Sequence, residues 1–207
     1  MKKIAIISFI LVLVIGYDIS NSKAQSKLSG GMRIGLSVSN LAGSDVSGSG
    51  PSTTPAGGVF LNYQPVTSFS IQPEVNVVSD GGNYELMLNG FPYHSVRVTY
   101  VQVPVLLKFT SDKALFSSEF KPSVFAGPAF NAMIFHSVQG EVLDNVPGGY
   151  SVNQKAQSTA FSIVAGIGGT INNLYLVNIR YNYGLTNTFT HGDAKASGIA
   201  LSVGFMF

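Results

Sequence analysis

The sequence predicts an all-β protein, an eight-stranded antiparallel up-and-down transmembrane β-barrel. Three observations support this fold class. Large apolar residues alternate with small or polar ones in eight successive segments, which is the period of a strand with two unlike faces. Only 11% of the 207 residues are charged, against about 25% in an average soluble domain. The connections between these segments are long and short in turn, as they are in outer-membrane barrels.

The first 24 residues have the three parts of a secretory signal peptide. Two lysines precede an apolar run at residues 4–16, which is too short for a membrane span of about 20 residues. Ser22 and Ala24 supply the small side chains that a signal peptidase requires before its cleavage site. We therefore expect residues 1–24 to be a signal peptide and residues 25–207 to form one barrel domain. An uncleaved anchor helix is the alternative.

Loss of the signal peptide would remove the net positive charge. The whole chain has 12 Lys and Arg against 10 Asp and Glu, and residues 1–24 contain three of these basic residues and one acidic residue, which leaves nine of each. A neutral chain offers no basic surface, so no nucleic-acid partner is expected. The absence of Cys excludes disulfides and thiolate metal sites. No motif points to a cofactor, and none is expected.

The segments that carry the alternation have about the length, 9–11 residues, with which a tilted strand crosses a bilayer core, or more. They are residues 31–40, 56–63, 69–78, 96–109, 120–134, 160–170, 174–185 and 196–207. The long connections are rich in Gly, Ser, Asn and Asp, as solvated loops are; they lie at 41–55, 79–95, 135–159 and 186–195. The short connections lie at 65–68, 110–119 and 171–173.

Taken in order, the clearest segments place apolar side chains on one face. These are Ile34, Leu36 and Val38 in the first segment, Ile71, Val75 and Val77 in the third, Val103, Val105 and Leu107 in the fourth, Phe161, Ile163 and Ile167 in the sixth, Val177, Ile179 and Tyr181 in the seventh, and Leu201, Val203 and Phe205 in the eighth. The opposite face carries Gly, Ser, Asn and Gln, together with Arg33, Glu74, Lys108 and Arg180.

The second, fourth and fifth segments keep the alternation less strictly. It is interrupted by Gly57 and Gly58, by the stretch 96–100, and by Pro122 and Pro128. A proline cannot donate a hydrogen bond to a sheet, and a glycine within a strand often marks a bulge. Bulges or bends are therefore predicted at these positions.

The size and polarity of the side chains on the two faces indicate which face meets lipid. A soluble lipocalin-like barrel also alternates, but its apolar face lies inside. In this chain the face with the smaller side chains is too polar for a dry core. The interior of an eight-stranded barrel is just wide enough to be filled by such side chains. We therefore expect the large apolar side chains to point outward into lipid, while barrel closure leaves no unpaired edge.

An even number of strands would place both termini at the same end, which we expect to be periplasmic in the outer membrane. Aromatic residues occur near the predicted strand ends on that side, where an interfacial girdle is expected: Tyr63, Phe109, Phe120, Tyr175 and Phe207. The expected partners are outer-membrane lipids and the barrel-insertion machinery, the latter through the C-terminal strand that ends in Phe207. The barrel is expected to be a monomer.

Charged residues on the inward face are the first candidates for a functional site. A charge in a narrow lumen is costly unless it is paired and hydrogen-bonded, so Glu74 is expected to contact Lys108, Arg180 or both. The predicted lumenal polar network comprises Glu74, Lys108, Arg180, Gln72, Gln102, Asn178 and Asn182. Such a network would plug the barrel and set its register, and a proton or solute path is the alternative.

The long loops hold the remaining candidates. His94, His136 and His191 fall in separate loops without the close spacing of zinc ligands, so no metal site is expected. His191 and Asp193 with loop serines are the one cluster that resembles a catalytic arrangement, and no catalytic residue is assigned. Apolar and aromatic loop residues would either pack over the barrel mouth or bind another protein or a lipid. They are Tyr84, Leu86, Met87, Leu88, Phe91, Tyr93, Val142, Leu143, Val146 and Tyr150.

Four motifs occur along the chain: IQPEV at 71–75, YVQVPVLLKF at 100–109, VFAGP at 124–128 and RYNYGLTN at 180–187. In this order, and over essentially the whole chain after the signal peptide, they resemble the PorT-like outer-membrane β-barrel family of Bacteroidetes. The resemblance implies an eight-stranded outer-membrane barrel, and the namesake of that family is connected with export of secreted proteins across the outer membrane. The family more often has an acidic residue at the position of Gln102.

The sequence therefore favours a non-catalytic outer-membrane protein with a structural or interaction role, and the resemblance adds an accessory part in protein export. Two alternatives stay open: a small porin-like channel or transporter for a small or apolar solute, and an outer-leaflet enzyme. A continuous lumen would favour the channel, whereas a closed stack around Glu74 would favour the structural role.

Overall fold

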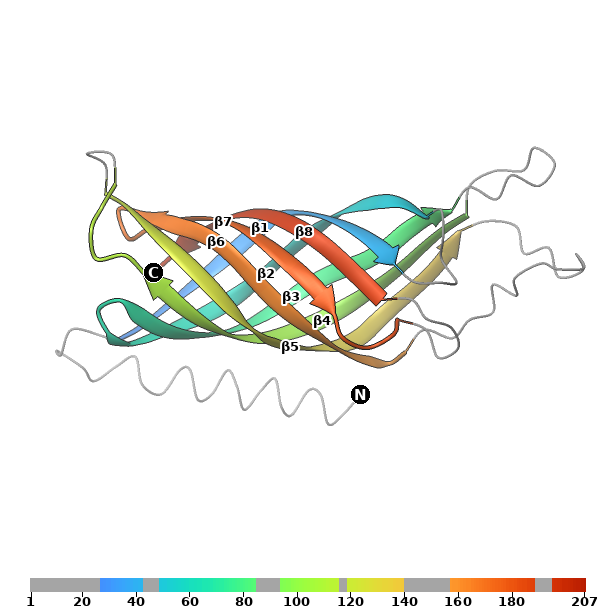
Figure 1. Cartoon of the computed structure of the whole chain (residues 1–207), viewed down its shortest axis with the longest axis horizontal. Coiled ribbons are helices and arrows are strands. Elements are labelled where there is room, and N and C mark those ends of the chain that lie inside the picture. The colour runs from blue at the N-terminus through green and yellow to red at the C-terminus, as the bar shows by residue number, and fades with distance from the viewer. Residues whose placement is uncertain (1–26, 43–48, 85–93, 116–118, 140–156, 189–194) are drawn as a thin grey trace, which may run out of the picture.

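The computed structural model describes residues 27–42, 49–84, 94–115, 119–139, 157–188 and 195–207. These residues form eight β-strands that close into one barrel (Figure 1). The strands are β1 (Leu28–Ala42), β2 (Ser49–Val66), β3 (Phe69–Tyr84), β4 (His94–Thr110), β5 (Phe120–Gln139), β6 (Thr159–Ile171), β7 (Tyr175–Gly184) and β8 (Lys195–Met206). Each strand pairs antiparallel with the next, and β8 pairs with β1. The predicted fold class is confirmed.

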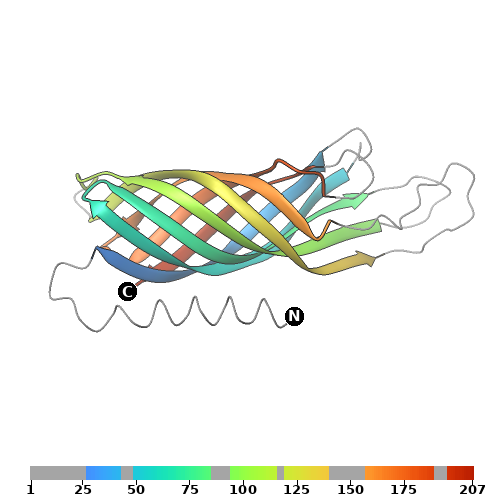
Figure 2. The same cartoon turned by 90° about the horizontal axis from the view of Figure 1, so that it is seen from below.

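The two ends of the barrel differ in their connections. At the turn end, short connections join β2 to β3, β4 to β5 and β6 to β7, and the C-terminus lies at this end (Figure 1). The backbones of Gly30 and Phe207 exchange hydrogen bonds of 3.0 and 2.9 Å, so the start of β1 and the end of the chain lie side by side. The opposite end is the loop end. Seen from below, the strands run at a steep tilt to the long axis (Figure 2).

Side-chain exposure divides the strands into an outer and an inner face. On the outer wall, Ile34 is 70% exposed and Leu201 is 55% exposed. On the inner wall, Glu74 is 2% exposed and Arg180 is 4% exposed. The prediction that bulky apolar side chains point away from the axis is confirmed. An apolar wall around a closed hydrogen-bond ladder is what a lipid environment requires.

Aromatic residues gather on the outer wall near the turn end, as predicted for the strand ends on this side. Tyr63, Phe109, Tyr175 and Phe207 are all exposed. Tyr175 also contacts Phe205 edge-to-face, with ring centroids 6.1 Å apart. Phe120 differs from the others because its half-buried ring lies against Gly169.

One layer of the interior is apolar, which the polar character of the inward face did not indicate. Leu106, Phe125, Ala129 and Val164 form a buried cluster inside the barrel. A Cβ atom on Gly166 would lie 2.4 Å from the backbone oxygen of Ile179 and 2.5 Å from the Phe125 ring. Close approach of an aromatic ring and a neighbouring strand therefore requires glycine at this position.

Three strands extend furthest into the predicted loops. β2 begins at Ser49, β3 ends at Tyr84 and β5 ends at Gln139. Residues 49–55 are small, polar or proline, so no hydrophobic period marks them, but the ladder with β1 continues to Ser52. The predicted boundaries are wrong because backbone pairing continues where neither face of the strand needs to be apolar.

The ladder has irregularities at some of the predicted positions. The β2–β3 register shifts between Pro51 and Gly57, and the β4–β5 register shifts at Thr99–Tyr100, which confirms irregularity near Gly57 and within 96–100. Of the bulges or bends predicted at Pro122 and Pro128, a bulge is wrong, because both residues pair with β6 in unbroken register; a bend stays a prediction. The missing proline N–H removes a hydrogen bond, but the residues before and after each proline also pair with β6 and keep the strand in place.

The tightest connection joins β6 to β7. The Leu174 N–H donates to the Ile171 carbonyl at 3.0 Å. Between them, Asn172 and Asn173 have φ angles of 56° and 53°. Two central residues in the left-handed region are typical of a type I′ hairpin turn, in which asparagine is favoured. The short connection predicted at 171–173 is this turn.

Several predictions fall partly or wholly outside the described residues. The signal peptide at 1–24 lies outside them, as do His191, Asp193 and all of the apolar loop candidates except Tyr84, which ends β3. The placement of His94 and His136 in loops is wrong, because they belong to β4 and β5, which extend beyond the predicted boundaries. In the described part of the chain, no helix is long and apolar enough to cross a membrane.

The contact between Gly166 and Phe125 gives a first test. Gly166→Val would force the Phe125 ring and the neighbouring backbone apart, so we expect the free energy of unfolding to fall by about 1–3 kcal/mol. Ala165→Val, on the adjacent outward-facing position, is the matched control and should change it little. Urea unfolding in phospholipid vesicles, followed by the gel mobility of the folded barrel, measures both variants. Equal midpoints for the two variants would contradict the packing argument.

Candidate functional site

A buried carboxylate joins three strands across the barrel lumen. Glu74 on β3 accepts hydrogen bonds through its Oε2 atom from Arg33 Nη2 on β1, at 2.8 Å, and from Arg180 Nη1 on β7, at 3.0 Å. The three side chains are almost completely buried. Neither β1 nor β7 is a ladder neighbour of β3, so these ion pairs connect strands that share no backbone pairing.

Two amides complete the surroundings of this carboxylate. Gln72 Nε2 donates to Glu74 Oε1 at 2.7 Å, and Asn76 Nδ2 donates to Oε2 at 3.0 Å. Both amides lie two residues from Glu74 on the inner face of the same strand, as the period of a strand dictates. A buried ion pair is tolerated when further hydrogen bonds satisfy the remaining lone pairs, and both carboxylate oxygens have donors.

Lys108 joins this network indirectly. Its Nζ atom donates to Gln72 Oε1 at 3.4 Å, so Gln72 stands between the ammonium group and the carboxylate. Among the residues that the structure describes, the salt bridges are Arg33–Glu74 and Arg180–Glu74. Of the two contacts expected for Glu74, the one with Arg180 is direct and the one with Lys108 runs through an amide.

The Arg180 side chain is held by contacts on several sides. Its Nε atom donates to Asn178 Oδ1 at 3.4 Å, and Ser202 Oγ donates to the same oxygen at 2.7 Å. The guanidinium carbon lies 5.3 Å from the centroid of the Phe125 ring, a cation–π distance. The polar network therefore rests directly on the apolar layer of the interior.

Gln102 and Asn182 line the bore without a direct bond to the carboxylate. They border a cavity of about 20 Å³ together with Arg33 and Arg180. Gln102 Oε1, Asn182 Oδ1 and the second terminal nitrogen of each arginine have no partner among the described residues. A water molecule needs roughly 10–15 Å³ and two to four polar partners. The cavity therefore has room for about one bridging water molecule and not for a solute.

Arg33 lies outside the network predicted from the sequence, although the alternation predicts its side chain on the inward face. It pairs with Gly58 on β2 and with Gly204 on β8. Glycine on both sides leaves room for the arginine side chain. The glycines opposite Arg33 could have indicated the space for its side chain. Identifying them requires the register between neighbouring strands, and the alternation within one strand does not give that register.

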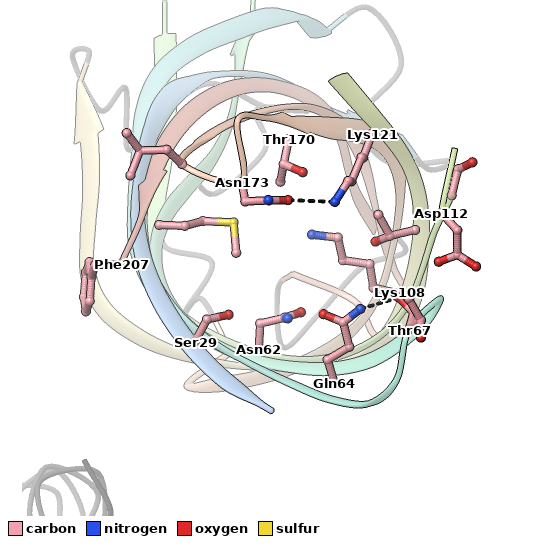
Figure 3. A pocket seen from close by; sticks show the side chains of 14 residues that line it. Ser29, Asn62, Gln64, Thr67, Lys108, Asp112, Lys121, Thr170, Asn173 and Phe207 are labelled. Atoms are coloured by element: carbon pink, nitrogen blue, oxygen red, sulfur yellow. Dashed lines mark hydrogen bonds between the residues drawn. The ribbon is translucent and has the colours of Figure 1, made fainter. Parts of the chain in front are cut away.

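A larger pocket opens at the turn end, next to Lys108. It has a volume of about 400 Å³. Figure 3 shows Lys108, Lys121, Asn62 and Thr170 among the side chains that surround it, and Lys121 Nζ donates to Asn173 Oδ1 at 3.1 Å. Toward the loop end, by contrast, the cavity beside Asp80 has a volume of only about 20 Å³. The bore is thus open at the turn end and filled further in.

The buried triad gives a second test. Glu74→Gln would leave two buried guanidinium groups without a carboxylate, and breaking a buried pair in this way costs about 3–5 kcal/mol of folding free energy. Glu119→Gln, at an exposed carboxylate of the turn end, should have almost no effect. Urea midpoints in vesicles compare the two variants. If they unfold at the same urea concentration, the triad does not stabilise the barrel.

Comparison with known proteins finds a match to a family model described as an outer membrane protein beta-barrel domain, over residues 20–190. No curated protein matches the chain. Among solved structures, Neisserial surface protein A aligns with a TM-score of 0.49 and 11% identity, covering 86% of this chain and 97% of that one. OprG of Pseudomonas aeruginosa aligns with a TM-score of 0.46 and 14% identity, covering 87% and 94%. Outer membrane protein W of E. coli aligns with 0.44 and 15%, covering 89% and 100%.

The family model covers most of the chain, whereas the likeness to solved structures is too distant to add to the argument. The closed ladder, the apolar outer wall and the filled polar bore agree with the family match. This chain belongs to the family of the outer membrane protein beta-barrel domain and is a small outer-membrane β-barrel protein.

Proposed function

We propose that this protein is a non-catalytic scaffold that holds an interaction surface in the outer membrane, with an accessory part in protein export. The observation that carries the proposal is the filled bore. The ion pairs of Glu74 with Arg33 and Arg180 cross it, and the cavities beside the network and toward the loop end are each about 20 Å³. Because the bore is filled, a functional surface would lie at the ends of the barrel or on its outer wall.

In the proposed orientation, the turn end and both termini face the periplasm. Short periplasmic turns and longer outer loops are the usual arrangement of bacterial barrels. Residues 1–24 would direct the chain across the inner membrane and be removed. The strand ending in Phe207 would engage the barrel-insertion machinery, and the folded monomer would be surrounded by lipid. The exposed apolar side chains of the wall support this lipid contact.

The four motifs of the PorT-like resemblance support the same view. Three of them contribute the side chains that meet in the bore, namely Glu74, Lys108 and Arg180, and the fourth contributes Phe125, against which Arg180 packs. The motifs therefore account for a structural plug. The link to export comes from the resemblance alone, and the surface that would serve it is the loop end, where a protein partner would bind.

The alternatives have less support. A channel for a small solute would need a wider bore beside the triad. The enzyme alternative depended on His191 and Asp193, which lie outside the described residues.

Conductance across a planar lipid bilayer tests the scaffold against the channel. We expect the native barrel to give no stepwise conductance, because the triad fills the bore. The variant R33S/E74S/R180S/L106A/F125A, checked for folding by its gel mobility, should conduct because it lacks the triad and the two largest side chains of the apolar layer. Discrete conductance steps from the native protein would rule out the plugged scaffold.

The role in export is tested in the organism that makes the protein. Deletion of the gene should lower the amount of secreted protein in the medium, and the native chain should restore it. A photo-crosslinking residue at Tyr84 or Tyr150 should capture a component of the export pathway, whereas one at Lys113 on the turn end should not. Unchanged secretion, together with capture of lipopolysaccharide alone, would refute the interaction role.

A further inference from the structure

The pocket at the turn end is a blind cup with excess positive charge. Its volume of about 400 Å³ is within the usual range of roughly 300–1,000 Å³ for small-molecule sites. Of the described residues, the most deeply buried charged side chains are Arg33, Lys108 and Arg180 against the carboxylate of Glu74. Asp80 is half-buried and lines the small cavity toward the loop end. Glu74 already pairs with both arginines, so Lys108 shares this one carboxylate with two other cations and forms no direct ion pair with it.

Lys108 is the decisive residue because it is buried and points into the cup. Lys108 is only 4% exposed, and its Nζ atom donates to Gln72 Oε1 at a long 3.4 Å. Figure 3 shows the ammonium group directed toward the middle of the pocket. A buried ammonium group with one weak neutral acceptor is costly, and an anion in the cup would offset that cost.

A second cation faces the same space. Lys121 on β5 is half-buried, and its ammonium group donates to Asn173 Oδ1 at 3.1 Å on the inner side of the ring of strands (Figure 3). Asp112 is the side-chain carboxylate among the residues that line the pocket. It is exposed, accepts from Ser68 Oγ at 2.6 Å and forms no salt bridge with either lysine. Both ammonium groups therefore keep N–H donors for a ligand.

We propose that this pocket binds a small oxyanion, a phosphate or a phosphate monoester, between the ammonium groups of Lys108 and Lys121. A dianion matches the charge of two lysines, which bind phosphate as point charges. The neutral part of the lining adds hydroxyl and amide groups, among them Ser111, Thr110, Thr170 and Asn62. The Asn62 Oδ1 atom is buried without a partner, and rotation of the amide by a half turn would present a donor instead.

The test is a titration of the full-length folded barrel in detergent micelles. Inorganic phosphate, glycerol phosphate and chloride are added at matched ionic strength, and NMR shifts of the Thr110, Ser111 and Asn173 amides are followed. Phosphate or its ester should give saturable shifts, and chloride should not. The tighter of the two phosphate probes would show whether the ligand is the free ion or an ester.

Three variants decide whether the lysines form the site. Lys108→Gln and Lys121→Gln should each weaken phosphate binding about tenfold or more, because each removes a charge-assisted hydrogen bond. Lys113→Gln, at an exposed lysine of the connection between β4 and β5, should leave phosphate affinity unchanged. If Lys108→Gln does not fold, Lys121→Gln alone decides. Equal shifts with chloride, or unchanged phosphate affinity in the folded Gln variants at 108 and 121, would overturn the proposal.

Discussion

Hydrocarbon offers a peptide backbone no hydrogen-bond partner, and the architecture of this protein follows from that constraint. Eight strands meet it by pairing β8 with β1, which leaves a bore so narrow that side chains must fill it. Charged side chains within the bore cannot be hydrated freely. Glu74 is therefore stable there only because Arg33 and Arg180 reach it from two other strands.

These ion pairs also connect strands that are not neighbours in the barrel. Backbone pairing links each strand only to its neighbours, whereas Glu74 ties β3 to β1 and β7 through the interior. The Phe125 ring supports Arg180 from the apolar layer. The polar network and the apolar layer thus together connect strands across the interior. Its charge is uneven, because Lys108 adds a further cation toward the turn end.

Much of the fold could be predicted because lipid imposes a single solvent along the outer face of every strand. The alternation of Leu201, Val203 and Phe205 with small residues reports that solvent directly. Strand ends were less predictable, since residues 49–55 carry no such period. The alternation within β3 predicts the inward position of Glu74. Its contact with Arg33 depends on the strand tilt and register that bring the two side chains together across the interior, and no pattern within one strand contains these.

The seam between β1 and β8 has a consequence for how the molecule assembles. Every other pair joins strands adjacent in sequence and can form as a local hairpin, but this pair joins the two extremes of the described chain. Its loop closure is the longest and therefore costs the most chain entropy. Until β8 arrives, the backbone of β1 is an open edge, prone to mispairing with other chains.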